Sequence, residues 1–172
     1  MNRLKQFVTD PEDVGSHFEY LKSIFGYQFG EEVSDCVFRD NQFFKIQRSV
    51  NTWRIRNVLY DGELFLVLRP QDGLFSLTLK SASLIKQCAP FPDYRVAVKR
   101  EVKDVIQNET GNVFAKHVVE VDRSLRSGDE AIIVSEDDEL IGVGKMRLSG
   151  SEVMEYKRGV AVSVRERWKK RK

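Results

Sequence analysis

The chain has 172 residues, of which 41% are hydrophobic and 31% are charged, and its formal net charge at pH 7 is +2. This composition excludes a wholly disordered chain, and the lack of any run of 18 consecutive apolar residues excludes a transmembrane helix. The N-terminal sequence MNRLKQFVTDPED has no apolar signal core, so we expect a cytoplasmic protein made of one ordinary domain or two small ones.

The first half of the chain is predicted to form an α/β domain over residues 1–90. Apolar residues at helical spacing predict a helix over residues 13–25, which Gly26 should end. A second helix is expected over residues 80–88, and the breaker Ala89-Pro90-Phe91-Pro92 then marks the domain boundary. Asp61-Gly62 is a strong signal for a two-residue hairpin. Strands are expected over residues 37–47, 52–60, 63–69 and 74–79.

Cysteine and histidine are too sparse to indicate a metal site. Cys36 and Cys88 are 52 positions apart and show no CxxC spacing, so we expect two reduced thiols and neither a disulfide nor a metal centre. The only histidines are His17, within the first helical pattern, and His117, at the start of a strand. We therefore expect no metal and no cofactor.

The second half is predicted to be a small closed or partly closed β-barrel, with five short strands and two small helices. The first helix, over residues 101–108, should leave through Gly111 in the left-handed conformation. The second should begin at a capping box formed by Ser149 and Glu152 and close at Gly159. The strands are expected over residues 95–99, 117–121, 131–135, 140–148 and 160–164.

This half resembles a PUA domain, the RNA-binding module named after pseudouridine synthases and archaeosine transglycosylases. The resemblance rests on four pieces in order and covers residues 91–168. They are the sequences GNVFAKHV at 111–118, GDE at 128–130, VGK at 143–145 and KRGVAV at 157–162.

The first half resembles the domain that precedes PUA in archaeal tRNA-guanine transglycosylases. That resemblance rests on Asp61-Gly62-Glu63-Leu64, Leu68-Arg69, Asp72-Gly73-Leu74-Phe75 and Leu77-Thr78-Leu79. A similar unit occurs in a family of eukaryotic translation and ribosome-associated proteins. The catalytic (β/α)8 barrel of the transglycosylases, with its aspartates and zinc site, has no counterpart here, so the resemblance implies a chain that holds RNA and is not an enzyme.

Other chemical motifs have ordinary structural explanations. Gly142-Val143-Gly144-Lys145 superficially looks like a phosphate loop, but these glycines lie within a strand pattern and are expected to mark a bulge. The acidic run Glu136–Glu139 is expected to be a solvated hairpin tip. His117 is expected to pack at a strand start or to touch RNA, and not to act as a general base.

The PUA resemblance implies an RNA-binding edge where residues 111–117 meet the last strand. Gly111 would allow the RNA backbone to approach, and the amides of Asn112 and Val113 could bond phosphate or a base edge. Phe114 could stack on a base, although core packing is favoured for it. The remaining candidates for phosphate contact are Arg100, Lys116, Arg165 and Arg167. His117 is a candidate at the start of a strand, and Trp168 could provide a stacking platform for a base.

Positive charge gathers at the C-terminal end. The last eight residues, RERWKKRK, carry six basic side chains and one acidic, whereas residues 92–164 carry 11 basic and 14 acidic. We interpret residues 169–172 as a basic tail that contacts phosphate without reading sequence; a solubilising end is the alternative.

Two functions follow from these patterns. The leading one is a non-catalytic protein that binds tRNA at its acceptor stem and 3′ end, as an accessory or detached subunit of a tRNA-modifying enzyme. The alternative is a translation-linked adaptor whose first domain contacts the small ribosomal subunit or a protein. Neither reading involves a membrane.

Overall fold

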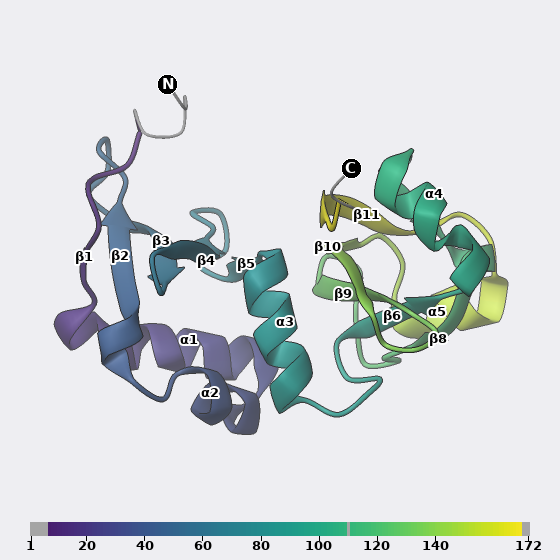
Figure 1. The fold of residues 1–172 in the computed structure, drawn as a ribbon, viewed down its shortest axis with the longest axis horizontal. Helices are drawn as coiled ribbons and strands as arrows, with labels where there is room; N and C mark the ends of the chain where they lie inside the picture. The colour runs from purple at the N-terminus through teal and green to yellow at the C-terminus, as the bar shows by residue number, and fades with distance from the viewer. Residues whose placement is uncertain (1–6, 110, 170–172) are drawn as a thin grey trace. The chain divides into compact units, whose positions relative to one another are not determined.

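The computed structural model describes residues 7–109 and 111–169, and the chain divides into two compact units, Met1–Cys88 and Ala89–Lys172. Figure 1 shows that each unit has a β-sheet and helices of its own. No helix in the described residues combines the length and apolar character needed to cross a bilayer.

The first unit is an antiparallel five-stranded sheet in the order β1-β2-β3-β4-β5, with its helices packed on one face (Figure 1). Buried phenylalanines fill the space between sheet and helices; Phe38 and Phe44, for example, stack with ring centroids 4.7 Å apart. The bounds of its strands are β1 Glu12–Asp13, β2 Phe44–Arg48, β3 Ile55–Tyr60, β4 Glu63–Leu68 and β5 Phe75–Leu77. Its helices are η2 Gly15–His17, α1 Phe18–Phe29, α2 Glu31–Val37, η3 Asn41–Phe43 and α3 Leu79–Cys88.

The hairpin signal at Asp61-Gly62 is confirmed. It joins β3 to β4, and both residues have positive φ, 50° and 79°, as the mirror-image turns of tight hairpins require. The helix predicted over residues 80–88 is also confirmed, as α3.

Two expectations for this unit are wrong. The first helix continues through Gly26 to Phe29 and is ended by Gly30, whose φ is 87°. Gly26 lies within α1 and faces α2, where a Cβ built on it would be in ordinary van der Waals contact with the Ser34 side chain, 3.4 Å away. The strand expected over residues 37–47 begins only at Phe44, since burial of Phe38 in the aromatic cluster turns the chain before β2.

The expectation of two free thiols is wrong as well. Cys36 and Cys88 form a disulfide, with their Cα atoms 5.9 Å apart. The bond joins α2 to the last residue of α3, two helices that pack against each other and whose adjacency the spacing of 52 residues does not reveal. It closes most of the first unit into a covalent loop.

The second unit is a six-stranded curled sheet in the order β7-β11-β10-β9-β6-β8. Its two outermost strands, β7 and β8, are separated in sequence only by the three residues of η5, so the sheet must curl until its edges approach each other. The predicted partly closed barrel is therefore confirmed. The strands are β6 Arg95–Val98, β7 Asn112–Phe114, β8 Val118–Val121, β9 Glu130–Ser135, β10 Leu140–Met146 and β11 Val160–Arg167. The helices are η4 Arg100–Val102, α4 Lys103–Asn108, η5 Ala115–His117 and α5 Gly150–Tyr156.

The glycines of β10 mark strand irregularities, as predicted. The pairing register with β11 shifts between Val143 and Gly144. Val143 pairs with Glu166 and Gly144 pairs with Val164, so Arg165 falls outside the register with β10 and forms a bulge. A Cβ at Gly144 would lie 2.1 Å from the carbonyl oxygen of Ser163, so only glycine permits this approach. The capping box of Ser149 and Glu152 at the start of α5 is also confirmed.

All four residues of strand β6 are buried. It lies between β8 and β9 and pairs in parallel with β9. Its first residue, Arg95, is only 1% exposed and donates to the carboxylate of Asp138 and to the carbonyl oxygens of Ala89 and Asp93. The guanidinium thus fixes the segment that leads into the barrel.

The acidic tip at Glu136–Glu139 is the exposed hairpin turn that its sequence suggests, but its carboxylates also form ion pairs. Asp138 pairs with buried Arg95, Asp137 with Arg100, and Glu139 with Lys103. The tip therefore ties the β9–β10 hairpin to β6, η4 and α4.

Candidate nucleic-acid interface

Strand β7 lies beside β11, as the predicted RNA-binding edge requires. Phe114 pairs with Val160 and Asn112 with Ser163, and the Val164 amide donates to the Gly111 carbonyl at 2.8 Å. Residues 111–114 therefore run along the first half of the last strand, with β7 as one edge of the curled sheet.

The side chains of this segment differ from what the sequence predicts. Phe114 was expected to favour the core, but 41% of its surface is exposed. Val113, by contrast, is 1% exposed and packs in the barrel core, so only its backbone remains a candidate for RNA contact. Gly111 does not have the positive φ expected of a left-handed helix exit, yet no atom lies within 4 Å of a Cβ built on it, so its surroundings are open.

Three predicted phosphate contacts already have protein partners. Arg165 is the extra residue of the β11 bulge, and the bulge directs its guanidinium onto the buried carboxylate of Glu130. Arg167 donates to the Ile106 carbonyl in the last turn of α4, at 3.3 Å. Arg100 holds both carboxylate oxygens of Asp137, at 3.0 and 2.8 Å. These arginines stabilise the barrel, so they are weaker candidates for phosphate than an unengaged cation.

A different set of exposed cations and aromatic rings gathers at the η5 end of the barrel. The Ala115 amide donates to the Gly159 carbonyl at 2.9 Å, and η5 packs against α5. The C-terminal end of α5 is thereby brought beside β7. We call the exposed side chains at this place the basic–aromatic patch, consisting of Phe114, Lys116, Tyr156, Lys157 and Arg158.

Sequence reasoning missed three members of this patch. Tyr156, Lys157 and Arg158 follow a short helix and precede a strand, and the run alone does not indicate which segment it faces. Lys157 has a φ of 49°, and this left-handed residue turns the chain from α5 into β11. The capping box predicted the start of this helix, but no local signal linked its end to residues 114–116.

His117 lies between two lysines at the same end of the barrel. Its pKa is lowered by desolvation and by the positive charges of Lys116 and Lys99, against a smaller opposing effect of Glu101. The Lys99 amide also donates to the His117 carbonyl, at 2.9 Å, which fixes the two residues together. A phosphate at this place would meet two ammonium groups and an imidazole that it could help to protonate.

We predict that the imidazole of His117 titrates at lower pH in the folded protein than in the unfolded chain. Because the folded pKa is the lower one, the unfolded state binds more protons between the two values. The folded barrel should therefore lose stability as pH falls from above the unfolded pKa through the folded one. NMR titration of the His117 ring, with and without urea and with His117→Gln to assign the signal, measures both values. A folded midpoint at or above the unfolded one would contradict this prediction.

Trp168 and Lys169, the first residue of the predicted tail, lie at the other end of β11. Trp168 is 55% exposed, and its amide donates to the Ile141 carbonyl at 2.7 Å. Phe114 pairs with Val160, eight residues before Trp168, and eight extended residues span roughly 25 Å. The two predicted stacking residues, Phe114 and Trp168, therefore lie near opposite ends of β11. Residues 170–172 of the predicted tail lie outside the described part of the chain.

In the described part of the chain, no three residues of histidine, cysteine, aspartate or glutamate are grouped so that they could hold a metal ion. The side chains gathered at the interface are cations and aromatic rings. Such groups bind phosphates and stack on bases, and they supply no metal ligand set.

Comparison with known protein families divides the chain close to the boundary between the two units. Residues 19–92 match the family described as the patch-forming domain C2 of tRNA-guanine transglycosylase, and residues 94–167 match the PUA domain. Both resemblances noted in the sequence are thus confirmed, and the match of the first half extends well beyond the motifs between Asp61 and Leu79 that suggested it.

Among curated proteins, the chain is similar to archaeal tRNA-guanine(15) transglycosylases. It is 38% identical to that of Methanocaldococcus jannaschii over 146 residues, which cover 84% of this chain and 22% of the relative. It is 32% identical to that of Thermococcus kodakarensis over 161 residues, which cover 94% of this chain and 27% of the relative. The chain thus spans about a quarter of the length of these relatives.

Solved structures share the fold. A hypothetical protein from Pyrococcus horikoshii superposes with a TM-score of 0.70 at 19% identity, over 92% of this chain and 93% of the other. A conserved PUA domain protein from Thermoplasma acidophilum superposes with a TM-score of 0.57 at 22% identity, over 87% of this chain and 89% of the other.

Proposed function

Because this chain carries a C2 domain of the tRNA-guanine transglycosylase type followed by a PUA domain, we propose that it binds RNA and catalyses no reaction on it. The RNA we propose is tRNA, held by its acceptor stem and 3′ end on behalf of a tRNA-modifying enzyme. The observation that carries the proposal is the basic–aromatic patch beside β7, on the domain whose family is an RNA-binding module.

The chemistry of the patch suits a single-stranded RNA end. Phe114 and Tyr156, 41% and 59% exposed, offer faces on which unpaired bases can stack, and such stacking contributes about 1–3 kcal/mol per base. The exposed cations Lys116, Lys157 and Arg158 can neutralise phosphates. The open space at Gly111 lets an RNA backbone approach β7. An unpaired end presents both base faces and base edges, so it can be recognised without entering a groove.

The curated relatives are enzymes, but the region they share with this chain is a pair of domains of RNA-binding type. An accessory role therefore requires a catalytic partner, which we propose to be a tRNA-modifying protein. The partner would contribute the chemistry, and this chain would contribute affinity for the tRNA end.

The proposal predicts that removing the 3′ CCA from a tRNA transcript weakens binding by at least tenfold. Titration by fluorescence anisotropy, with transcripts labelled at the 5′ end, measures both affinities. Equal affinity for the two transcripts would contradict recognition of the 3′ end, and no binding to either would contradict the proposed function as a whole.

Salt dependence tests whether the patch supplies the phosphate contacts. Lys157→Gln together with Arg158→Gln should make the log–log salt slope shallower by about 1.4, because each single-strand contact contributes about 0.7. The matched control is Arg123→Gln with Arg126→Gln, which removes the same charge near the N-terminal end of α5. If both pairs changed the slope equally, the patch would not be the phosphate site.

A further inference from the structure

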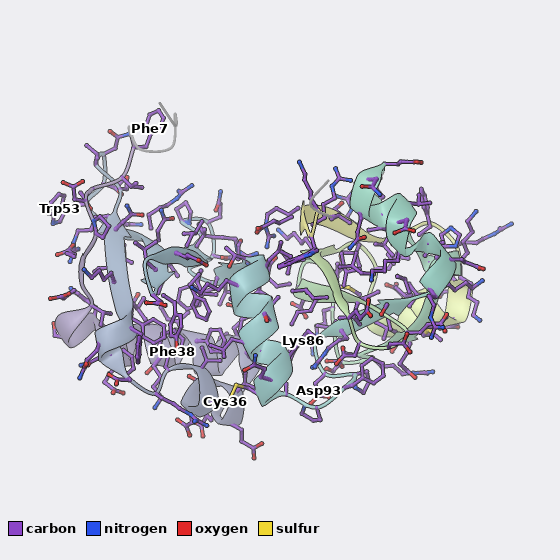
Figure 2. The ribbon with its side chains drawn as sticks, in the orientation of Figure 1. Phe7, Cys36, Phe38, Trp53, Lys86 and Asp93 are labelled. Atoms are coloured by element: carbon purple, nitrogen blue, oxygen red, sulfur yellow. A yellow bond between two sulfur atoms is a disulfide. The ribbon has the colours of Figure 1, made fainter. Side chains whose placement is uncertain are left out.

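The loop between β2 and β3 exposes a tryptophan in an unusual backbone conformation. Trp53 has a φ of 61° and is 64% exposed. Figure 2 shows it projecting at the end of the first unit where Phe7 also lies. The left-handed region suits glycine or asparagine, and a bulky residue there is an outlier. Such outliers persist where the surrounding structure holds them, and they concentrate at functional sites.

The surrounding contacts hold Trp53 in place. Its amide donates to the Ser49 carbonyl at 2.8 Å, and its carbonyl accepts from Arg48 at 3.2 Å. The Arg48 guanidinium also lies 5.6 Å from the centroid of the tryptophan ring, in a cation–π contact. Arg48 is itself fixed by the Glu12 carboxylate at 2.7 Å and lies 3.1 Å from the His17 ring nitrogen. The indole is thus orientated from beneath while most of its surface remains open to solvent.

The chain around Trp53 is cationic. Residues 48–56 read RSVNTWRIR and contain three arginines and no acidic residue. Arg54 and Arg56 are exposed, and neither forms an ion pair within the described residues. Two further apolar side chains, Phe7 and Val50, are 61% and 54% exposed nearby, since the Val50 amide donates to the Phe7 carbonyl.

We propose that Trp53 is a second RNA contact, on which an unpaired base stacks while Arg54 and Arg56 contact the adjoining phosphates. The combination of an orientated aromatic face with unengaged arginines is what single-stranded nucleic acid requires. An acidic protein would pair with the arginines but would have no need of an open indole face. This inference rests on the proposed function, because it requires that the chain bind RNA.

Substitutions at Trp53 separate binding from folding. Trp53→Ala should weaken the affinity for a tRNA transcript about 5- to 100-fold, whereas Trp53→Tyr, which keeps an aromatic face, should retain most of it. Trp53→Gly should lower the affinity like alanine and yet raise the urea midpoint of the first unit, since glycine relieves the left-handed strain. A purely structural tryptophan would lose stability in the glycine variant.

Fluorescence locates the contact. In a Trp168→Phe background Trp53 is the only tryptophan, and adding the tRNA transcript should quench its emission in proportion to the bound fraction measured by anisotropy. The second contact is wrong if the transcript binds the Trp168→Phe protein without quenching Trp53 and also binds Trp53→Ala with undiminished affinity. The proposed function would still stand in that case. If the unsubstituted protein binds no RNA, both fail together.

Discussion

Replacing Asp138 by asparagine should lower the free energy of unfolding of the second unit by about 3 kcal/mol. The substitution keeps the size of the side chain and suits the left-handed backbone of residue 138, whose φ is 60°. What it removes is the negative charge facing Arg95, a guanidinium only 1% exposed. A buried charge that loses its counter-charge carries an uncompensated desolvation cost, and this cost is the source of the expected loss.

The neighbouring residue provides the matched control. Asp137→Asn removes the same charge from the same hairpin tip, but its partner Arg100 is 69% exposed, so the expected loss is below about 1 kcal/mol. Urea denaturation followed by Trp168 fluorescence, in a Trp53→Phe background, reports on the second unit alone. Equal losses in the two variants would mean that burial of Arg95 does not govern the stability of the tip.

Removing the disulfide should destabilise the first unit by about 4 kcal/mol. The Cys36–Cys88 bond closes a loop across a sequence separation of 52, and the loss of chain entropy in the unfolded state grows with the length of that loop. Cys36→Ser with Cys88→Ser should therefore lower the urea midpoint of the first unit, monitored through Trp53 in a Trp168→Phe background. The second unit contains no cysteine, so its midpoint should stay the same.

Dithiothreitol distinguishes the bond from the side chains. It should lower the midpoint of the wild-type first unit to that of the double-serine variant and should leave the variant unchanged. Two results together would contradict the presence of the disulfide. One is a urea midpoint of the wild-type first unit that does not change with the reductant, and the other is the detection of two free thiols in the unfolded protein without reductant.

The parts of the fold that short sequence signals encode were predictable. Asp61-Gly62 dictates its hairpin because both residues tolerate positive φ, and Ser149 with Glu152 satisfies the free amides at a helix start. The disulfide was not predictable, because it depends on α2 lying against α3, and α2 leads into residues that sequence patterning had assigned to a strand.

The candidate site was predictable only as a segment. The resemblance to a PUA domain placed residues 111–117 beside the last strand, and the β7–β11 pairing agrees. Which cations are unengaged depends on long-range ion pairs: Arg165 is directed to Glu130, 35 residues away, by a one-residue bulge. Charge along the sequence does not reveal such pairs, so the patch formed by Lys157 and Arg158 emerged only from the fold.

The strand order of the second unit has a consequence for biosynthesis. Strand β11 is the last to be made, yet it lies between β7 and β10, so the barrel stays incomplete until residue 167 has left the ribosome. The first unit, in contrast, has all its strands and helices by Cys88. At translation rates of about 5–20 residues per second, the first unit can fold roughly 4–16 s before the barrel can close. A nascent chain arrested during that interval would carry a folded first unit and an unsealed β-sheet.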